Sequence, residues 1–243
     1  MTIYFLIPVY NEAANLSELA VNITSALPSE NKFYLFVDDG SADNSVNIIK
    51  EKFSDKPYFI ITKEKNEGPG DSFNRGFEWI LQHSENNEDI VITLEADNTS
   101  DIHLLPKMYS ILNTGFDLVL ASVYAQGGGF DKTSFLRRLI SSIANMMMRF
   151  VFDIKILTLS SFYRAYKVDL LRKIKNQYQT VIEEKGFISM LEILIKSIRL
   201  NANIIEVPMI LYSKKRKGKS KMKKLKTMMS YFRFMMKSGK YKI

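Results

Sequence analysis

The first 120 residues alternate between short apolar runs and segments of helical periodicity, and this alternation restricts the possible folds most. Apolar runs predict strands at residues 3–9, 33–37, 58–62, 89–94 and 117–121. Between them, apolar side chains recur at helical spacing, and Asn11 is expected as the N-cap of the first helix. Strands that alternate with helices form parallel sheets covered on both faces. The sequence therefore predicts an α/β fold with a mostly parallel sheet flanked by helices.

The second half of the chain has a different pattern. Helices are expected at residues 134–152 and 186–199, and a strand bent at Pro208 is expected at residues 203–213. Residues 1–213 are expected to form the folded domain, and residues 214–243 a basic tail with an amphipathic helix.

The distribution of charge separates these two parts. The net charge is +8, yet residues 214–243 hold 13 of the 34 Lys and Arg residues and no Asp or Glu. Residues 1–213 hold 21 basic and 26 acidic residues, so this part is acidic. Such a basic tail favours a polyanionic partner, which can be an anionic lipid surface, phosphate groups or nucleic acid.

The tail also has an apolar face. Leu225, Met228, Met229, Phe232, Met235 and Met236 recur at helical spacing among lysines. This pattern is typical of a helix lying in a membrane surface, although a helix that packs on the core has a similar one. No run approaches the roughly 20 apolar residues that span a bilayer. We expect a peripheral protein on the cytoplasmic face of the membrane, and the absence of cysteine fits a reducing compartment.

Acidic residues follow two of the predicted strands. Glu95 and Asp97 are two apart at the end of the fourth strand, so their side chains project the same way. Carboxylate oxygens are preferred ligands of Mg²⁺ and Mn²⁺, although two acids at a strand end can also be simply solvated. Asp38 and Asp39 end the second strand, where acids accept hydrogen bonds from nucleotides but also favour turns.

A short glycine-containing loop precedes the third helix. Gly68 and Gly70 allow a ligand to approach the backbone amides, and Arg75 follows one to two helical turns later. Free amides at a helix start can bind phosphate. The signal is weak by itself, because an ordinary strand-to-helix turn has the same composition.

Taken together, these segments resemble family-2 glycosyltransferases of the GT-A fold, which are inverting enzymes that use nucleoside diphosphate sugars. The resemblance rests on residues 7–12 (IPVYNE), 37–43 (VDDGSAD), 66–68 (NEG) and 95–97 (EAD). Two later segments, residues 161–166 (SFYRAY) and 216–222 (RKGKSKM), are similar to the subgroup that includes dolichol-phosphate mannosyltransferases and polyprenyl-phosphate sugar synthases.

The resemblance implies a role for each matching residue. The nucleotide-sugar site is expected to comprise Pro8, Tyr10, Glu12, Asp38, Asp39, Gly68 and Arg75. Glu95, Asp97 and Thr99 are expected to hold Mg²⁺ or Mn²⁺. Asp97, Arg138 and Arg164 form the expected catalytic set, and Arg216, Ser220 and Lys221 are expected around the acceptor phosphate.

The chain departs from the family pattern at three positions. Glu95 stands where the family usually has Asp, Val123 where the subgroup often has Arg, and Thr158 where an Asp is expected. These departures bear on the choice of donor and metal.

The expected acceptor is a polyprenyl phosphate. A phosphate monoester is an anion near neutral pH, since its second pKa is about 6, and needs no general base. A sugar hydroxyl on a glycan needs one, and Glu183, Glu184 and Glu192 are candidates, so this alternative stays open. A non-catalytic module that binds membrane or nucleic acid is the alternative of another class. The acidic strand ends argue against nucleic acid, because without a metal they would repel its phosphates.

Overall fold

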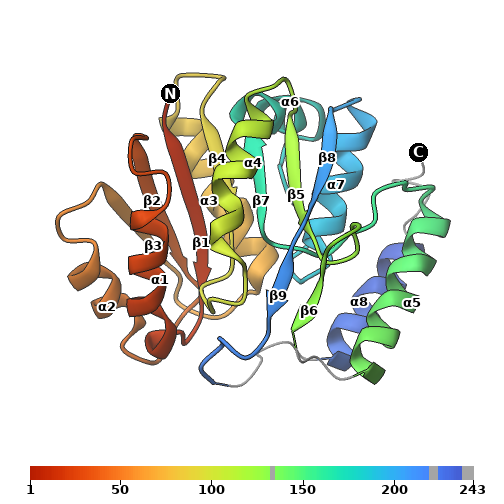
Figure 1. Cartoon of the computed structure of the whole chain (residues 1–243), viewed down its shortest axis with the longest axis horizontal. Coiled ribbons are helices and arrows are strands. Elements are labelled where there is room, and N and C mark those ends of the chain that lie inside the picture. Colours follow the sequence, from red (N-terminus) through yellow and green to blue (C-terminus); the bar gives the residue numbers. More distant parts are fainter. Residues whose placement is uncertain (132–134, 219–223, 237–243) are drawn as a thin grey trace.

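The computed structural model describes residues 1–131, 135–218 and 224–236 of the 243-residue chain. Strands and helices alternate in the first half (Figure 1). They are β1 (Ile3–Val9), α1 (Ala13–Ser25), β2 (Lys32–Asp38), α2 (Ser45–Lys52), β3 (Tyr58–Thr62), α3 (Pro69–His83), β4 (Ile90–Thr93), a 3-10 turn η1 (Ile102–Leu104), α4 (Leu105–Leu112) and β5 (Leu118–Ser122). The expected strands and helices of this half are confirmed.

The second half adds the remaining described elements. They are β6 (Gly129–Asp131), α5 (Phe135–Val151), β7 (Arg164–Lys167), α6 (Val168–Tyr178), α7 (Ser189–Arg199), β8 (Ile204–Pro208), β9 (Ile210–Tyr212) and α8 (Lys224–Met236). The expected bend at Pro208 separates β8 from β9. The sequence-based expectation does not include β7 or α6. Strand β7 has four residues and begins with Arg and ends with Lys, so it lacks the apolar alternation that marks a strand.

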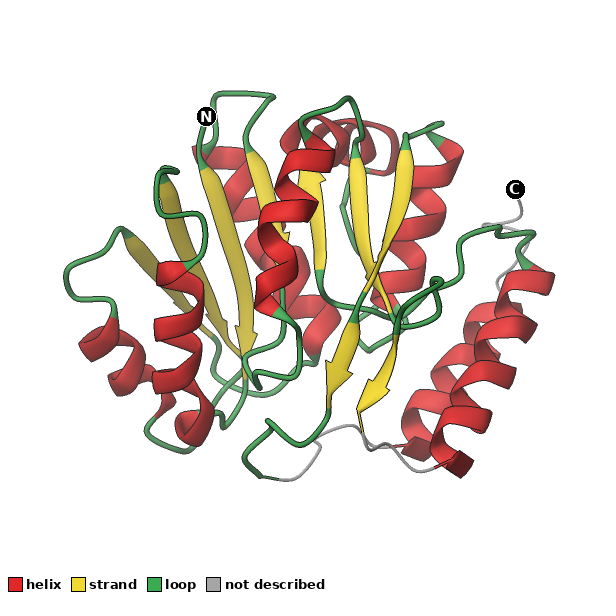
Figure 2. Cartoon of the chain, in the orientation of Figure 1, coloured by secondary structure: helices red, strands yellow, loops and turns green. Residues whose placement is uncertain are grey.

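The described residues form a seven-stranded sheet in the order β3-β2-β1-β4-β7-β5-β8 and a separate pair, β6 with β9. Strand β7 runs antiparallel to β4 and β5, and the other pairs are parallel. The fold is therefore the expected α/β architecture with a mostly parallel sheet, and Figure 2 shows helices on both of its faces.

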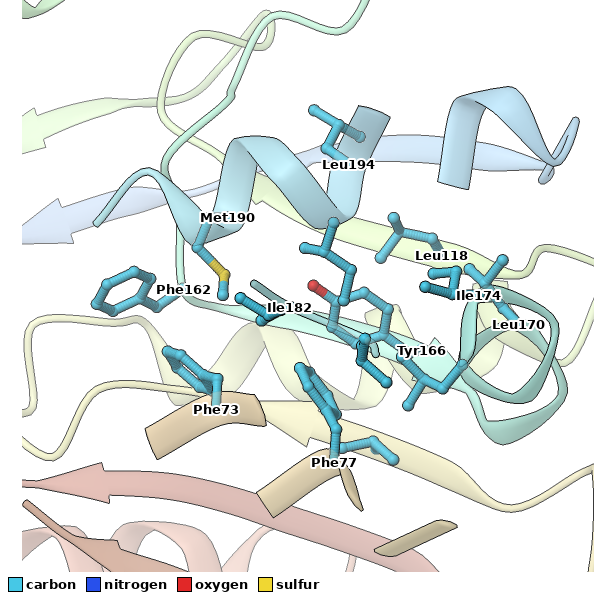
Figure 3. Packing of buried hydrophobic residues seen from close by; sticks show 14 of the residues in the cluster. Phe73, Phe77, Leu118, Phe162, Tyr166, Leu170, Ile174, Ile182, Met190 and Leu194 are labelled. Carbon is cyan, nitrogen blue, oxygen red and sulfur yellow. The ribbon is translucent and has the colours of Figure 1, made fainter. Parts of the chain in front are cut away.

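Each face of the sheet contributes to its own apolar core. In β1, Tyr4 and Leu6 pack in the cluster under α3, α6 and α7, whereas Phe5 and Ile7 pack in the cluster under α1, α2 and α4. This alternation follows from the two-residue repeat of a strand, and both faces are apolar because both are buried. Figure 3 shows the first cluster, in which the rings of Phe77 and Tyr166 meet edge to face.

The turn between β1 and α1 differs from the expectation. Asn11 is not the N-cap of α1, because it has a left-handed backbone with φ of 52° and precedes the capping position, Glu12. The Asp43 carboxylate, from the turn before α2, accepts a hydrogen bond from the Ala13 N–H at 3.0 Å. Asn11 instead accepts one from the Ala42 N–H, so the two turns are bonded to each other.

The first turn of α3 packs against the loop that precedes α7. The Gly70 N–H donates a hydrogen bond to the Lys185 carbonyl at 2.9 Å. A Cβ atom on Gly70 would lie 2.0 Å from the carbonyl oxygen of Glu184. The glycine is thus required for this close approach.

Replacing Gly70 with Ala should lower the free energy of unfolding by about 1–3 kcal/mol, because main-chain atoms have to move apart. Gly186 is the matched control from the same loop, since a Cβ there would have no atom within 4 Å. Urea unfolding of the two variants measures the difference. Equal midpoints for Gly70→Ala and Gly186→Ala would contradict this packing.

Candidate functional site

The order of the strands reverses between β1 and β4, which pair in parallel at the centre of the sheet. In open α/β sheets this reversal leaves a crevice beyond the carboxyl ends of the two strands, where ligands bind. Glu12 follows β1, and Glu95 and Asp97 follow β4. Glu95 interacts electrostatically with both Asp97 and Glu12, so the three carboxylates form one acidic cluster at this edge.

Asp97 lies at the centre of the acidic cluster and is 4% exposed. Its Oδ1 accepts hydrogen bonds from the main-chain N–H of Thr99 at 3.0 Å and from the Thr99 hydroxyl at 2.7 Å. Its Oδ2 accepts a hydrogen bond from Nε of Arg216 at 2.6 Å and pairs with a second nitrogen of the same guanidinium. Thr99 therefore orients Asp97, and Arg216 brings a cation of the basic tail into the acidic cluster.

The acidic cluster carries more negative charge than Arg216 balances. Burial, the Asp97 carboxylate and Glu12 raise the pKa of Glu95 well above its usual range, against the opposing effect of Arg216. Although burial lowers the pKa of Arg216, the carboxylates of Asp97, Glu95 and Glu12 raise it above its usual value. Additional positive charge would stabilise the ionised form of Glu95.

The donor atoms of the cluster fit a divalent cation. Glu95 and Asp97 offer the carboxylate oxygens that Mg²⁺ and Mn²⁺ prefer, and the Arg216 guanidinium shows that a cation is accommodated beside Asp97. In the described part of the chain, no group of three or more His, Cys, Asp and Glu side chains is arranged as a metal site. A metal held by Glu95 and Asp97 would complete its coordination with phosphate oxygens and water, as Mg²⁺ commonly does.

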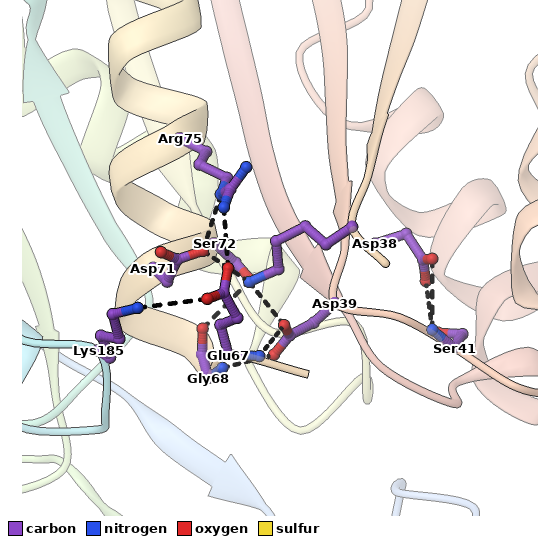
Figure 4. Close-up of polar contacts among 10 residues, drawn as sticks. Asp38, Asp39, Ser41, Glu67, Gly68, Asp71, Ser72, Arg75 and Lys185 are labelled. Carbon is purple, nitrogen blue, oxygen red and sulfur yellow. Dashed lines mark hydrogen bonds and ion pairs between the residues drawn. The ribbon is translucent and has the colours of Figure 1, made fainter. Parts of the chain in front are cut away.

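Asp39 fixes the glycine-containing loop to the end of β2 (Figure 4). Its carboxylate accepts hydrogen bonds from the N–H groups of Glu67 at 2.8 Å and Gly68 at 3.0 Å. It also pairs at 2.6 Å with Lys63, whose side chain is almost fully buried. Lys63 pairs in turn with Asp71 in the first turn of α3. Asp39 thus orders the loop near the expected nucleotide site.

The other residues expected at the nucleotide-sugar site lie near these strand ends. Asp38 is buried and accepts a weak hydrogen bond from the Ser41 N–H. Pro8 and Tyr10 are partly exposed at the end of β1. Arg75 pairs with Asp71 and Glu67, both at 2.8 Å. The guanidinium of Arg75 is half-exposed, and its two ion pairs link the loop to the first turn of α3.

Arg164 has a structural position. It is fully buried, and its guanidinium donates hydrogen bonds to the carbonyls of Ser161, Leu159 and Met190. These bonds tie β7 to the start of α7. These contacts account for its burial, and the catalytic role expected for Arg164 stays a prediction.

Three expected residues cannot be placed at the site. Ser220 and Lys221 lie outside the described residues. Arg138 belongs to α5, but its side chain is also outside the described part.

Two departures from the family pattern lie around the end of β5. The Thr158 hydroxyl is 2.6 Å from the Ser122 hydroxyl in a buried contact, and the Thr158 N–H donates to Glu206. Val123 follows Ser122 and packs on the core beneath α1, α2 and α4. Two uncharged hydroxyl groups, those of Ser122 and Thr158, therefore meet at the position where the family pattern has an Asp.

Two polar residues near the site are absent from the sequence-based set. Lys63 directly follows β3, and Asn15 lies in α1 with 1% exposure. Asn15 stands beside Leu16 on the predicted apolar face of its helix, where an amide needs hydrogen-bond partners. That mismatch is the sequence signal that would have identified it.

Comparison with known proteins identifies the family. Residues 4–175 match the family model described as Glycosyl transferase family 2. An undecaprenyl-phosphate mannosyltransferase of Micrococcus luteus is 28% identical over 91% of this chain and 88% of its own length. A dolichol-phosphate mannosyltransferase of Pyrococcus furiosus is 30% identical over 96% of this chain and 62% of its own length.

Solved structures support the fold. Glucosyl-3-phosphoglycerate synthase of Mycobacterium tuberculosis, in complex with Mn²⁺, uridine diphosphate and glucosyl-3-phosphoglycerate, matches with a TM-score of 0.66 at 16% identity. The match covers 97% of this chain and 77% of the synthase. The architecture, the acidic cluster at the strand reversal and the family match agree, and the chain belongs to glycosyl transferase family 2.

Proposed function

We propose that this family-2 glycosyltransferase moves a sugar from a nucleoside diphosphate sugar to a polyprenyl phosphate at a membrane surface, with inversion at the sugar carbon. The contact that carries the proposal is the pairing of Asp97 with Arg216. It brings together a carboxylate suited to a metal and a cation suited to phosphate in the crevice between β1 and β4. The names of the relatives, which include undecaprenyl- and dolichol-phosphate mannosyltransferases, support the class of acceptor.

Glu95 and Asp97 would hold Mg²⁺ or Mn²⁺ in this proposal, with Thr99 orienting Asp97. A bound divalent cation would neutralise the negative charge of the departing nucleoside diphosphate. The synthase of similar fold has been crystallised with Mn²⁺ and with Mg²⁺ together with uridine diphosphate, which supports this choice. Arg216 would face phosphate oxygens, and Arg138, Ser220 and Lys221 remain proposed members of the acceptor-phosphate site.

The state of Glu192 favours a phosphate acceptor over a hydroxyl acceptor. Glu192 is fully buried, lies 2.7 Å from Lys196, and accepts hydrogen bonds from the N–H groups of Glu183 and Glu184. The Glu192 carboxylate therefore holds the loop before α7 in place, and it is not positioned to take a proton from a substrate. Glu183 is also near Lys196, at 4.0 Å. Glu184 is the candidate base that keeps transfer to a glycan hydroxyl as the second hypothesis.

The helices α5 and α8 carry an apolar patch that fits a membrane surface. The patch consists of exposed side chains from both helices: Ile143, Met146, Met147, Phe150, Met229, Phe232 and Met236. Figure 1 shows the two helices side by side, and the rings of Phe152 and Phe234 meet between them at 5.5 Å. Phe234 is buried, so one face of α8 packs on the core while another stays apolar and exposed.

Such a patch is unfavourable in water but favourable in a lipid interface. Within the described ranges, no helix is long and apolar enough to cross a membrane. We infer that the patch lies in the bilayer surface and that the neighbouring basic residues bind anionic headgroups. The cytoplasmic leaflet is rich in anionic lipids, which supports our proposal that the protein binds to the cytoplasmic face.

The acceptor can be tested directly. With Mn²⁺ and a panel of nucleotide sugars, release of nucleoside diphosphate should require undecaprenyl phosphate, because the phosphate is the nucleophile. Undecaprenol, which lacks the phosphate, is the control and should give no release above background. Sugar transfer to a glycan hydroxyl in the absence of any lipid phosphate would show that the second hypothesis is right.

Asp97 tests the metal site. Asp97→Ala should lower the rate of transfer at least about a hundredfold, because charge on the leaving diphosphate is no longer neutralised. Chelation by EDTA should abolish transfer by the wild type, and added Mn²⁺ should restore it. Glu88→Gln, a carboxylate at the opposite end of the sheet, is the control. Wild-type rates in EDTA, or in Asp97→Ala, would contradict the metal site.

The apolar patch can be tested with vesicles that contain phosphatidylglycerol. The double replacement Phe150→Ser and Phe232→Ser should weaken binding at least about tenfold, since two large apolar side chains no longer enter the interface. Val21→Ser removes a similarly exposed apolar residue from α1 and should bind as the wild type does. Vesicle flotation measures the binding, and unchanged flotation of the double variant would exclude the patch.

A further inference from the structure

Asn15 joins the first helix to the basic segment near the end of the chain. We call residues 213–218 the strap; they follow β9, include the start of the basic tail, and contact both Asp97 and Asn15. The Lys217 N–H donates to Oδ1 of Asn15 at 2.9 Å, and Nδ2 of Asn15 donates to the Lys217 carbonyl at 3.1 Å. One carboxamide thus holds both main-chain groups of one strap residue, as a neighbouring strand would.

The same amide also contacts the acidic cluster. Nδ2 of Asn15 donates a hydrogen bond to Oε2 of Glu12 at 2.6 Å. Asn15 is 1% exposed, and burial of its amide is unfavourable unless these hydrogen bonds replace those with water. Lys217 as a whole residue is exposed, and its two hydrogen bonds with Asn15 are partly buried. We call the hydrogen bonds between Asn15 and the Lys217 main chain the clamp. The clamp requires the strap to lie over α1.

The end of β9, which leads into the strap, is hydrogen-bonded to the segment of the proposed metal site. The Tyr212 N–H donates to the carbonyl of Thr99 at 2.9 Å, and the Lys215 N–H donates to the carbonyl of Tyr212 at 3.0 Å. In the sequence, Arg216 lies between Lys215, which bonds to Tyr212, and Lys217, which bonds to Asn15. Its guanidinium is thereby held on Oδ2 of Asp97, while Oδ1 is occupied by Thr99.

A divalent cation that binds Asp97 through Oδ2 has to displace the Arg216 guanidinium. We propose that Asn15 is a positioning residue: through the main chain of Lys217 it sets Arg216 on Asp97 as a resident cation, which a divalent metal replaces. This inference rests on the proposed metal site of Glu95 and Asp97. The clamp makes Arg216 a competitor of the bare metal and keeps its charge within reach of the phosphates once the metal has entered.

Binding of Mn²⁺ alone to the full-length chain tests the clamp without any turnover. Asn15→Ala should bind Mn²⁺ about three- to tenfold more tightly than the wild type, because Arg216 occupies Asp97 for a smaller fraction of the time. Electron paramagnetic resonance of free Mn²⁺ or calorimetry gives the affinity. Asn15→Ala changes no charge, so a change in net charge cannot explain the tightening.

A pair of substitutions at Lys217 forms the matched control. Lys217→Pro deletes the main-chain N–H that Asn15 accepts, leaves the Asn15–Glu12 bond, and should match Asn15→Ala. Lys217→Ala keeps that N–H and removes only the exposed ion pair with Glu18, so its affinity should stay within about twofold of wild type. Because Lys217 lies on the exposed strap, this pair decides the question even if Asn15→Ala does not fold.

A double-mutant cycle ties the effect to Arg216. In an Arg216→Ala background, Asn15→Ala should give no further tightening, since the competing cation is gone. Wild-type affinity in both Asn15→Ala and Lys217→Pro, or a full effect of Asn15→Ala without Arg216, would overturn the inference. If Asp97→Asn loses Mn²⁺ in that case, the proposed metal site still stands. Wild-type affinity in Asp97→Asn would overturn both.

Discussion

The parallel pairing of β1 with β4 is the constraint on which the rest of the molecule depends. From β1 the chain adds β2 and β3 on one side, and it then adds β4 on the other side of β1. The turns that follow β1 and β4 therefore lead in opposite directions from the same edge of the sheet. Glu12 follows one of these strands and Glu95 and Asp97 follow the other, so the three carboxylates gather at this edge. The apolar cores on both faces hold the two strands in register and so keep the segments that carry these carboxylates next to each other.

The negative charge of this acidic cluster accounts for its contact with Arg216, in the basic segment that follows β9. An acidic domain with a basic tail lowers its electrostatic energy when a cation of the tail enters the acidic crevice, and Arg216 does so. The attraction within a partly buried ion pair offsets the desolvation of its charges only when the geometry is good and further hydrogen bonds support it. Here the support comes from Thr99 on Asp97 and from Asn15 on the strap.

The proposed donor site and the proposed membrane surface belong to one small fold. Both α5 and α8 carry exposed apolar side chains, and α8 follows the strap in the sequence. In the proposed function, the protein would supply orientation and charge balance, and an acceptor that is already an anion would supply the nucleophile.

The sequence by itself determined the strand-helix alternation, the mostly parallel sheet, and the acids at the strand ends, because these follow from local periodicity and from the position of charges along the chain. It also indicated the family through short motifs. Only the tertiary structure decided which polar groups meet. Arg164 fits the motif as well as Arg216 does, yet its guanidinium is buried against main-chain carbonyls, while that of Arg216 reaches Asp97. Asn15 and Lys217 are 202 residues apart, and local pattern carries no information about pairing over such a separation, which is set by how the helices and strands pack.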